Sequence, residues 1–370
     1  MFNLNLKKMK KLYVFVPAFI PVFVLLLLNS FVTKEEETGK KTPRVTKYSA
    51  SAPLCDSMRT APFGPVEKVD QDKSGAVNIV YKSADGGKTW QDISTGLPET
   101  DQPVIFFAGE TDLYLHAKNV MYRSDSKLKT PVWEKENIPG LQGESFWPST
   151  TIAFNRSGIT AFNYDGGIYQ KTPATANWLP IHQNFKKHAL RTTFEAADGA
   201  LFLGYDHDLY KSADKGKSWK QVQNGQIMNI VESEGILIAT GNSGIMRSAD
   251  NGEHWQEVIN EGGVGIAIER IKGGFAAISY NTKTETRRVR ISVDSGKTWQ
   301  AIDEGLPPSS FITSIKQMGN YLVCGHPDGI FLSSDMGKTW TKVHPGINAK
   351  VFSIYASGNA LYAVAGSAGC

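Results

Sequence analysis

Five aspartates recur in one short sequence context and are the first candidates for chemistry. Asp85, Asp214, Asp250, Asp294 and Asp335 each lie two residues after a serine and two residues before a glycine. Repeated carboxylates of this kind suit calcium binding or acid–base catalysis. One aspartate per repeat would be spread around a repetitive fold and would not converge on one substrate. We therefore expect these five carboxylates to stabilise tight turns.

A second set of carboxylates is better suited to catalysis, because glycoside hydrolysis requires two acidic groups roughly 5 to 10 Å apart. The candidates are Glu144, Asp206, Asp208 and Asp328. Residues that could bind a ligand beside them are Trp147, Arg191, Tyr205, His207 and His326.

Three arginines within four positions, Arg287, Arg288 and Arg290, would suit a carboxylate or sulfate ligand. Arg290 stands two residues before a repeated serine, where the other well-preserved copies carry Tyr81, Tyr210, Met246 and Phe331. Two interpretations remain open. Arg290 either pairs at the edge of its structural unit or belongs to a binding site with Arg287 and Arg288.

The elements that position these residues follow from an internal repeat. An eight-residue segment, Ser-x-Asp-x-Gly-x-x-Trp, which we call the box, ends at Trp90, Trp219, Trp255, Trp299 and Trp340. Two degraded copies end at Trp133 and Trp178, so the seven tryptophans are separated by 43, 45, 41, 36, 44 and 41 residues. A period of this length indicates a stacked or radial repeat fold.

Four short apolar runs with turn residues between them fill each repeat, for example Phe311–Ile315, Tyr321–Cys324 and Gly329–Leu332 before a run that follows Trp340. This pattern is typical of a blade in an all-β propeller. The first repeat has only Ala76–Tyr81 before its box, and the chain ends with two runs, Val351–Tyr355 and Ala360–Ala365. We predict seven four-stranded blades over residues 74–370, closed by N- and C-terminal strands in one blade.

This topology also predicts where a ligand binds. Each box joins the third strand of a blade to the fourth, so the second-to-third and blade-to-blade connections share the opposite face, here called the loop face. The candidate carboxylates, arginines and histidines named above lie in or beside those connections. Closure would also bring Cys55 towards Cys370, and we hypothesise that these two cysteines form a disulfide in an oxidising compartment.

The N-terminal 73 residues differ from the repeats. Lys7, Lys8, Lys10 and Lys11 precede an apolar run, so residues 1–33 are predicted to be an export signal, either cleaved or retained as a membrane anchor. Residues 34–73 are charged, contain proline and are predicted to be a flexible linker. These lysines are the only charges before Lys34, so the remaining 36 basic and 36 acidic residues balance, which argues against nucleic acid as a partner.

The box, as in Ser83-Ala84-Asp85-Gly86-Gly87-Lys88-Thr89-Trp90, resembles the Asp-box or bacterial neuraminidase repeat. That repeat occurs in sialidases, sortilin-type receptors, xyloglucan-cleaving glycosidases and photosystem II assembly-factor proteins. The resemblance implies a propeller in which the box is a structural turn away from any active site. It does not imply one particular activity.

The sequence is compatible with two functions. The first is an exported, monomeric, non-catalytic scaffold that binds a protein or glycan on its loop face without a cofactor or metal, as the resemblance to single seven-bladed assembly factors implies. The alternative is a glycoside hydrolase of the sialidase or xyloglucan-cleaving type. Against it, no Arg-Ile-Pro segment precedes the first box, the blade count is seven where sialidases have six, and xyloglucan-cleaving enzymes use two propellers.

Overall fold

The computed structural model describes residues 79–99, 104–118, 120–138, 150–163, 167–172, 177–181, 190–347 and 350–367. These residues form strands connected by turns and loops. Among them, no helix has the length and apolar character needed to cross a membrane. The predicted signal or anchor (1–33), the predicted linker (34–73), Cys55 and Cys370 lie outside the described residues.

The strands form seven antiparallel four-stranded sheets, which we number as blades in chain order. Blade 1 contains β1 (Val80–Ser83), β2 (Gln91–Asp92), β27 (Lys350–Ser357) and β28 (Ala360–Ser367). Blade 2 contains β3 (Ile105–Ala108), β4 (Asp112–Ala117), β5 (Val120–Asp125) and β6 (Glu134–Glu136). Blade 3 contains β7 (Thr150–Asn155), β8 (Gly158–Asn163), β9 (Ile168–Lys171) and β10 (Leu179–Pro180).

The remaining four blades are each continuous in sequence. Blade 4 contains β11 (Leu190–Glu195), β12 (Leu201–Tyr205), β13 (Asp208–Ser212) and β14 (Lys220–Asn224). Blade 5 contains β15 (Ile227–Ser233), β16 (Ile236–Gly241), β17 (Gly244–Ser248) and β18 (Gln256–Ile259). Blade 6 contains β19 (Gly265–Ile271), β20 (Gly274–Asn281), β21 (Thr286–Ser292) and β22 (Gln300–Ala301), and blade 7 contains β23 (Ser314–Met318), β24 (Tyr321–His326), β25 (Gly329–Ser333) and β26 (Thr341–Pro345).

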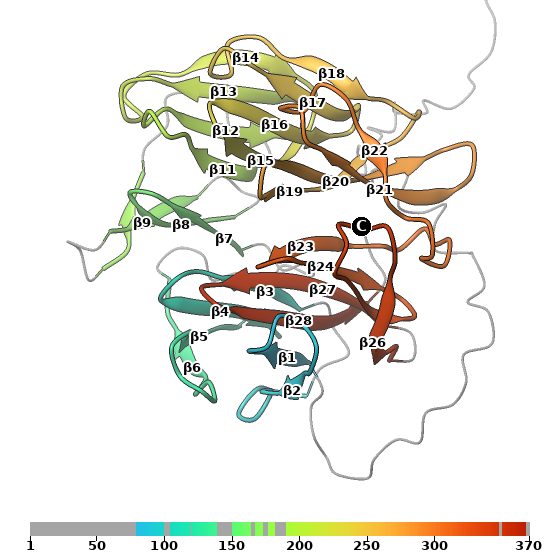
Figure 1. Ribbon diagram of the computed structural model, residues 1–370. Helices are drawn as coiled ribbons and strands as arrows, with labels where there is room; N and C mark the ends of the chain where they lie inside the picture. Colours follow the sequence, from blue (N-terminus) through green and yellow to red (C-terminus); the bar gives the residue numbers. More distant parts are fainter. Residues whose placement is uncertain are drawn as a thin grey trace, which may run out of the picture. The chain divides into compact units, whose positions relative to one another are not determined.

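Blade 1 is shared between the two ends of the described chain, as the sequence predicts. Its strand order is β2-β1-β28-β27, and Tyr81 on β1 lies opposite Ala363 on β28. Figure 1 shows the blue β1 and β2 beside the red β27 and β28. This pairing covers an edge that β28 would otherwise leave open.

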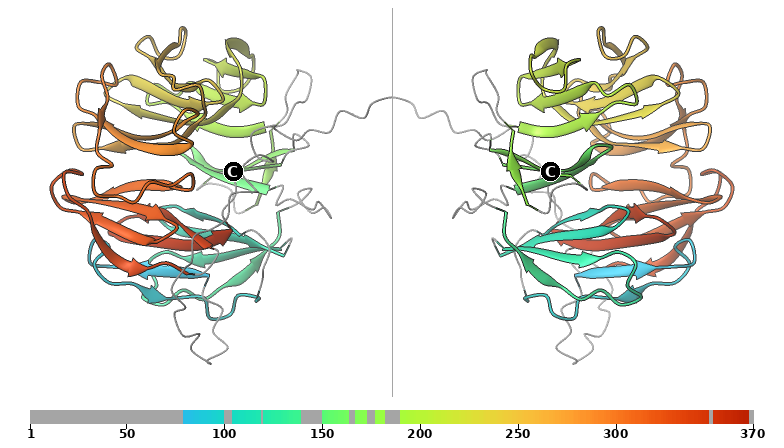
Figure 2. Two further views of the ribbon diagram at one scale, coloured as in Figure 1. Left: turned by 90° about the vertical axis from the view of Figure 1, so that its right-hand side faces the viewer. Right: turned by 90° about the vertical axis from the view of Figure 1, so that its left-hand side faces the viewer.

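The first strands of the blades contact one another in a closed series, β3 to β7, β11, β15, β19, β23, β27 and back to β3. The chain is therefore a seven-bladed β-propeller, and Figure 2 shows its blades from two sides. One predicted boundary is wrong, because β23 begins at Ser314 and not at Phe311. The Ile312 carbonyl and the Thr313 hydroxyl instead bond to Arg287 and to the Phe352 carbonyl, outside their own sheet.

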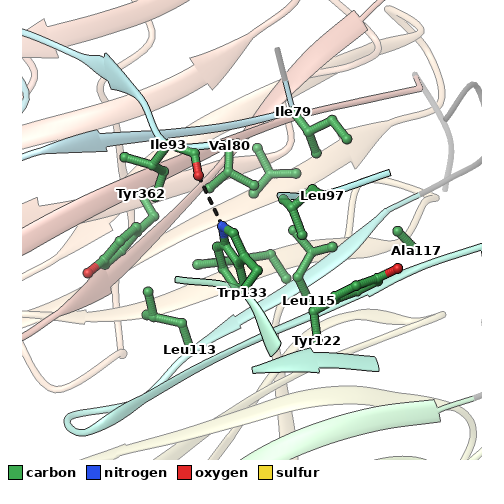
Figure 3. Packing of buried hydrophobic residues seen from close by; sticks show 12 residues of the cluster. Ile79, Val80, Ile93, Leu97, Leu113, Leu115, Ala117, Tyr122, Trp133 and Tyr362 are labelled. Atoms are coloured by element: carbon green, nitrogen blue, oxygen red, sulfur yellow. Dashed lines mark hydrogen bonds between the residues drawn. The ribbon is translucent and has the colours of Figure 1, made fainter. Parts of the chain in front are cut away.

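Apolar side chains pack between neighbouring blades and form the core. Figure 3 shows the cluster between blades 1 and 2, where Val80 and Tyr362 of blade 1 pack with Leu113 and Trp133 of blade 2. The Trp133 Nε1–H donates to the Ile93 carbonyl at 3.0 Å, so this degraded copy still ties its blade to the preceding one. Burial of such side chains is the main stabilising contribution.

Each box is a turn closed by its own side chains. In the first box the Ser83 hydroxyl donates to Asp85 at 2.8 Å and accepts from the Gly87 N–H at 2.9 Å. The second carboxylate oxygen of Asp85 accepts from the Thr89 hydroxyl at 2.6 Å. The serine–aspartate bond recurs at Asp214, Asp250, Asp294 and Asp335. The carboxylate is thus fully engaged in folding the turn.

The glycine of the blade 6 box, Gly296, is required for two reasons. Gly296 has φ of +77°, a left-handed conformation that side chains disfavour. A Cβ at this position would also lie 2.5 Å from the Ile238 Cδ1 of the preceding blade. The following tryptophan, Trp299, packs in the cluster between blades 5 and 6 and donates to the Gly296 carbonyl at 3.2 Å. Each box therefore closes its turn and contacts its neighbour.

Candidate functional site

The loop face is held together by hydrogen bonds between the two kinds of connection that the topology places there. In blade 4, the Gly225 N–H donates to the His207 carbonyl at 2.6 Å. At blade 6, the Thr282 N–H donates to the Glu261 carbonyl at 3.2 Å and the Arg287 N–H to the Ser309 carbonyl at 2.8 Å. Second-to-third and blade-to-blade connections thus lie together.

Arg191 and Asp206 form an ion pair on this face. Arg191 lies on β11 at a β-bulge between Leu190 and Thr192, which redirects its side chain. Its Nε donates to the Asp206 carboxylate at 2.5 Å, and the Gln226 side-chain amide donates to the same oxygen at 3.1 Å. The Arg191 and Asp206 side chains are 40% and 20% exposed, so the group can still contact a ligand.

The neighbouring turn contributes three further predicted residues. The Asp208 carboxylate accepts from the Gln221 amide at 2.6 Å, and the same amide donates to Asn224 at 2.6 Å. His207 is exposed at the tip of the turn. Tyr205 is buried, which raises the pKa of its hydroxyl, and its ring packs edge-on against Tyr210 at 5.9 Å. We call Arg191, Asp206, His207, Asp208, Gln221, Asn224 and Gln226 the blade 4 cluster.

His326 and Asp328 lie on blade 7, three blades further along the chain. The His326 Nδ1 accepts from the Asp328 N–H at 3.0 Å, so its Nε2 carries the proton that it shares with the Pro307 carbonyl at 2.9 Å. Burial lowers the pKa of His326, which keeps the ring neutral. The histidine therefore fixes a turn, while the Asp328 side chain is 51% exposed.

The three arginines of β21 do not form one site. Side chains alternate across a strand, so Arg287 faces blade 7 while Arg288 and Arg290 lie on the other side of the sheet. Arg288 binds Asp303 through two bonds, of 2.5 and 3.1 Å. Arg290 pairs with Glu261 and donates to the Ser279 hydroxyl at 2.8 Å. Arg290 thus pairs with a carboxylate at the blade edge, and Arg287 lies on the opposite side of the strand from Arg288 and Arg290.

Arg287 is the most buried of the three, with 4% of its surface exposed. Its Nη1 donates to the Ile312 carbonyl at 2.9 Å. Burial lowers the pKa of its guanidinium to about 10, so the group remains charged at neutral pH.

Two candidates, Glu144 and Trp147, lie outside the described residues. Within the described part of the chain, no group of three or more His, Cys, Asp or Glu residues has a metal-binding arrangement. Cys324 is a buried free cysteine whose thiol pKa is raised by burial. This thiol is an apolar core group and not a nucleophile.

The partners of these residues were not among the predicted site residues; they are Gln221, Gln226, Glu261 and Asp303. The sequence contained a feature that could have indicated Glu261 and Asp303 as partners of the arginines. They are acidic residues in the connections before and after blade 6, whose third strand carries the arginines. No comparable sequence feature indicated the two glutamines, Gln221 and Gln226, as partners.

No family model and no curated protein matches the sequence. The structure resembles the GH74 xyloglucanase from Xanthomonas campestris, with a TM-score of 0.53 and 17% identity over 79% of this chain and 55% of the enzyme. It also resembles YCF48 from Cyanidioschyzon merolae, with a TM-score of 0.52 and 12% identity over 72% of this chain and 97% of that one.

A third similar structure is catalytically inactive virginiamycin B lyase from Staphylococcus aureus with quinupristin, with a TM-score of 0.51 and 11% identity over 71% of this chain and 94% of the lyase. This chain spans 39% and 55% of the length of two GH74 enzymes that it matches. At these identities the likenesses show the propeller fold alone. The propeller fold occurs in GH74 enzymes, in the lyase and in YCF48 alike. The function must therefore be argued from the site.

Proposed function

We propose that this protein is an exported, non-catalytic binding scaffold, and that its blade 4 cluster holds a protein or glycan partner on the loop face. It acts outside the cytoplasm as a monomer and meets the membrane only through its N-terminal segment. The single observation that carries the proposal is the Arg191–Asp206–Gln226 group, in which a candidate catalytic carboxylate accepts hydrogen bonds from a guanidinium and an amide.

This arrangement suits recognition better than proton transfer. A general acid must hold a proton and present it to the leaving group, whereas Asp206 accepts two charged or polar donors from its own chain. Asp208 is likewise bonded to the Gln221 amide. Arginine, amide and carboxylate groups fixed by one another present donors and acceptors in a preorganised pattern. Such a pattern matches the backbone of a peptide or the hydroxyls of a sugar.

The test is binding of full-length protein to an array of peptides and polysaccharides that includes xyloglucan and sialylated glycans. Arg191→Ala should weaken any specific interaction by about tenfold or more, because arginine is a frequent binding hot spot. Lys217→Ala is the matched control, since Lys217 is exposed in the box of the same blade. Equal loss in both variants would contradict the proposal.

The same array tests the alternative function. The protein would be a glycoside hydrolase, and the proposal overturned, if it released free sugar from any polysaccharide of the array and Asp206→Asn abolished this release with the fold intact. Binding without release, lost in Arg191→Ala, supports the scaffold.

A further inference from the structure

Arg287 is a buried charge to which no described residue serves as a counter-ion. It lies on the face of β21 that packs against blade 7, next to Val289 and close to Ile312 in the core between the two blades. Within the described residues no carboxylate pairs with it, and its Nε is buried without a hydrogen-bond partner. Transfer of an unpaired charge into a protein interior is strongly unfavourable.

The neighbours of Arg287 show that the arrangement is specific to this residue. Arg288 and Arg290, one and three residues further along the same strand, each pair with a carboxylate, Asp303 and Glu261 respectively. Both of these arginines are more exposed than Arg287, and so need a counter-ion less. The most buried guanidinium of the strand is thus the one that the described chain leaves uncompensated.

We propose that Arg287 binds a small carboxylate-class oxyanion at the interface between blades 6 and 7. With Nη1 donating to the Ile312 carbonyl, the Nε–H and the second terminal nitrogen form the remaining edge of the guanidinium. Two parallel N–H groups on that edge match the two oxygens of one carboxylate. Tyr280, directly opposite Arg287 on β20, supplies a phenol beside the charge.

The segment 309–312 controls access to this site. The Ser309 and Ile312 carbonyls both accept from Arg287, and the Ser310 hydroxyl donates to the Glu285 carbonyl. The anion therefore enters by displacement of this segment and remains as a tightly held group. Because Glu285 is an exposed acid in the adjoining turn, its own carboxylate is the competing source of negative charge.

The experiment is thermal unfolding of the full-length protein during titration with sodium formate, with sodium chloride keeping the ionic strength constant. A ligand that binds only the folded state should raise Tm saturably, here by about 2 to 4 °C. Arg287→Met should abolish the rise, and Arg288→Met, which removes a neighbouring arginine already paired with Asp303, should retain it. An equal rise in Arg287→Met, or no rise in the wild type, would overturn the proposal.

A second measurement reports on Arg287 in the wild-type protein itself. In protein labelled with ¹⁵N-arginine, the Arg287 Nε–H resonance, assigned by its absence in Arg287→Lys, should shift saturably with formate. An unshifted resonance overturns the proposal. So does a formate response confined to Glu285→Gln, because Glu285 would then be the natural counter-ion. Neither readout needs the partner of the proposed scaffold, so the two proposals can fail separately.

Discussion

Arg290 on β21 is paired with Glu261, which lies in the connection between blades 5 and 6. Equivalent positions in other blades hold Tyr81, Tyr210, Met246 and Phe331, which pack against the preceding blade. An ion pair thus replaces an apolar contact at this one blade interface. The Ser279 hydroxyl completes the group by accepting from Arg290 at 2.8 Å.

Removal of one partner of the Arg290–Glu261 pair should lower the free energy of unfolding more than removal of both partners. Arg290→Met leaves the largely buried Glu261 carboxylate without its partner and should lower the free energy of unfolding by about 3 kcal/mol. The double variant Arg290→Met with Glu261→Met should recover much of that loss. Urea unfolding measures both, with Lys220→Ala as a control because Lys220 is 70% exposed. Additive effects of the two substitutions would contradict this prediction.

Alanine substitutions at two glycines with similar φ angles distinguish the cost of backbone strain from the cost of a steric clash between blades. Gly305 has φ of +90° with no atom near its hypothetical Cβ, so Gly305→Ala should cost about 1 kcal/mol. Gly296→Ala adds overlap with Ile238 and should cost about 2 kcal/mol more. Chemical denaturation of the two variants provides the comparison. Equal destabilisation would mean that the box glycine is required for its backbone angle alone.

The boxes should make the protein resistant to acid. Hydrogen bonds from the Thr339 hydroxyl and N–H, and from Ser333, lower the pKa of Asp335 to about 2. An unfolded aspartate titrates near 3.8, so this contribution to stability is present above that pH and is lost as the pH falls towards about 2. Thr339→Val should raise the pKa and move acid unfolding to higher pH, which circular dichroism along a pH series will detect. The substitution of exposed Thr284 by valine should leave the acid transition unchanged.

His326 should make stability depend on pH in a higher range. Burial lowers its pKa below the ordinary value of 6.5, so the folded state binds fewer protons than the unfolded state. The contribution of His326 to the free energy of unfolding is therefore fully present above about pH 6.5 and is lost as the pH falls below that value. Denaturant midpoints at pH 7.5 and 5.0 should differ more in the wild type than in His326→Gln. Replacement of the exposed His207 by glutamine should preserve the wild-type difference.

The repeat and its closure were predictable because both follow from the repeated sequence pattern and its incomplete copies. The box aspartates bond within five residues of themselves, and the tryptophan spacing counts the blades directly. Ring closure follows from the incomplete repeats at the two ends, and the pairing of β1 with β28 confirms it.

The candidate site was less predictable because its partners come from connections without a repeated pattern. Gln226 reaches Asp206 across 20 residues, and Glu261 reaches Arg290 across 29 residues. The separation of Arg287 from Arg288 was available from strand alternation, yet adjacency in sequence suggested a cluster. The buried His326 bonds to the Pro307 carbonyl, a partner that no spacing rule indicates.

The construction of blade 1 from β1 and β28 has a consequence for synthesis on the ribosome. Within the propeller, β1 is made first and must wait for β28, so a nascent chain remains an open arc until β28 has been translated. A premature stop codon would leave that arc with unpaired strands at both ends, which are sites for association between copies. Truncated forms should therefore aggregate, and quality control should remove them, even when six blades have been translated in full.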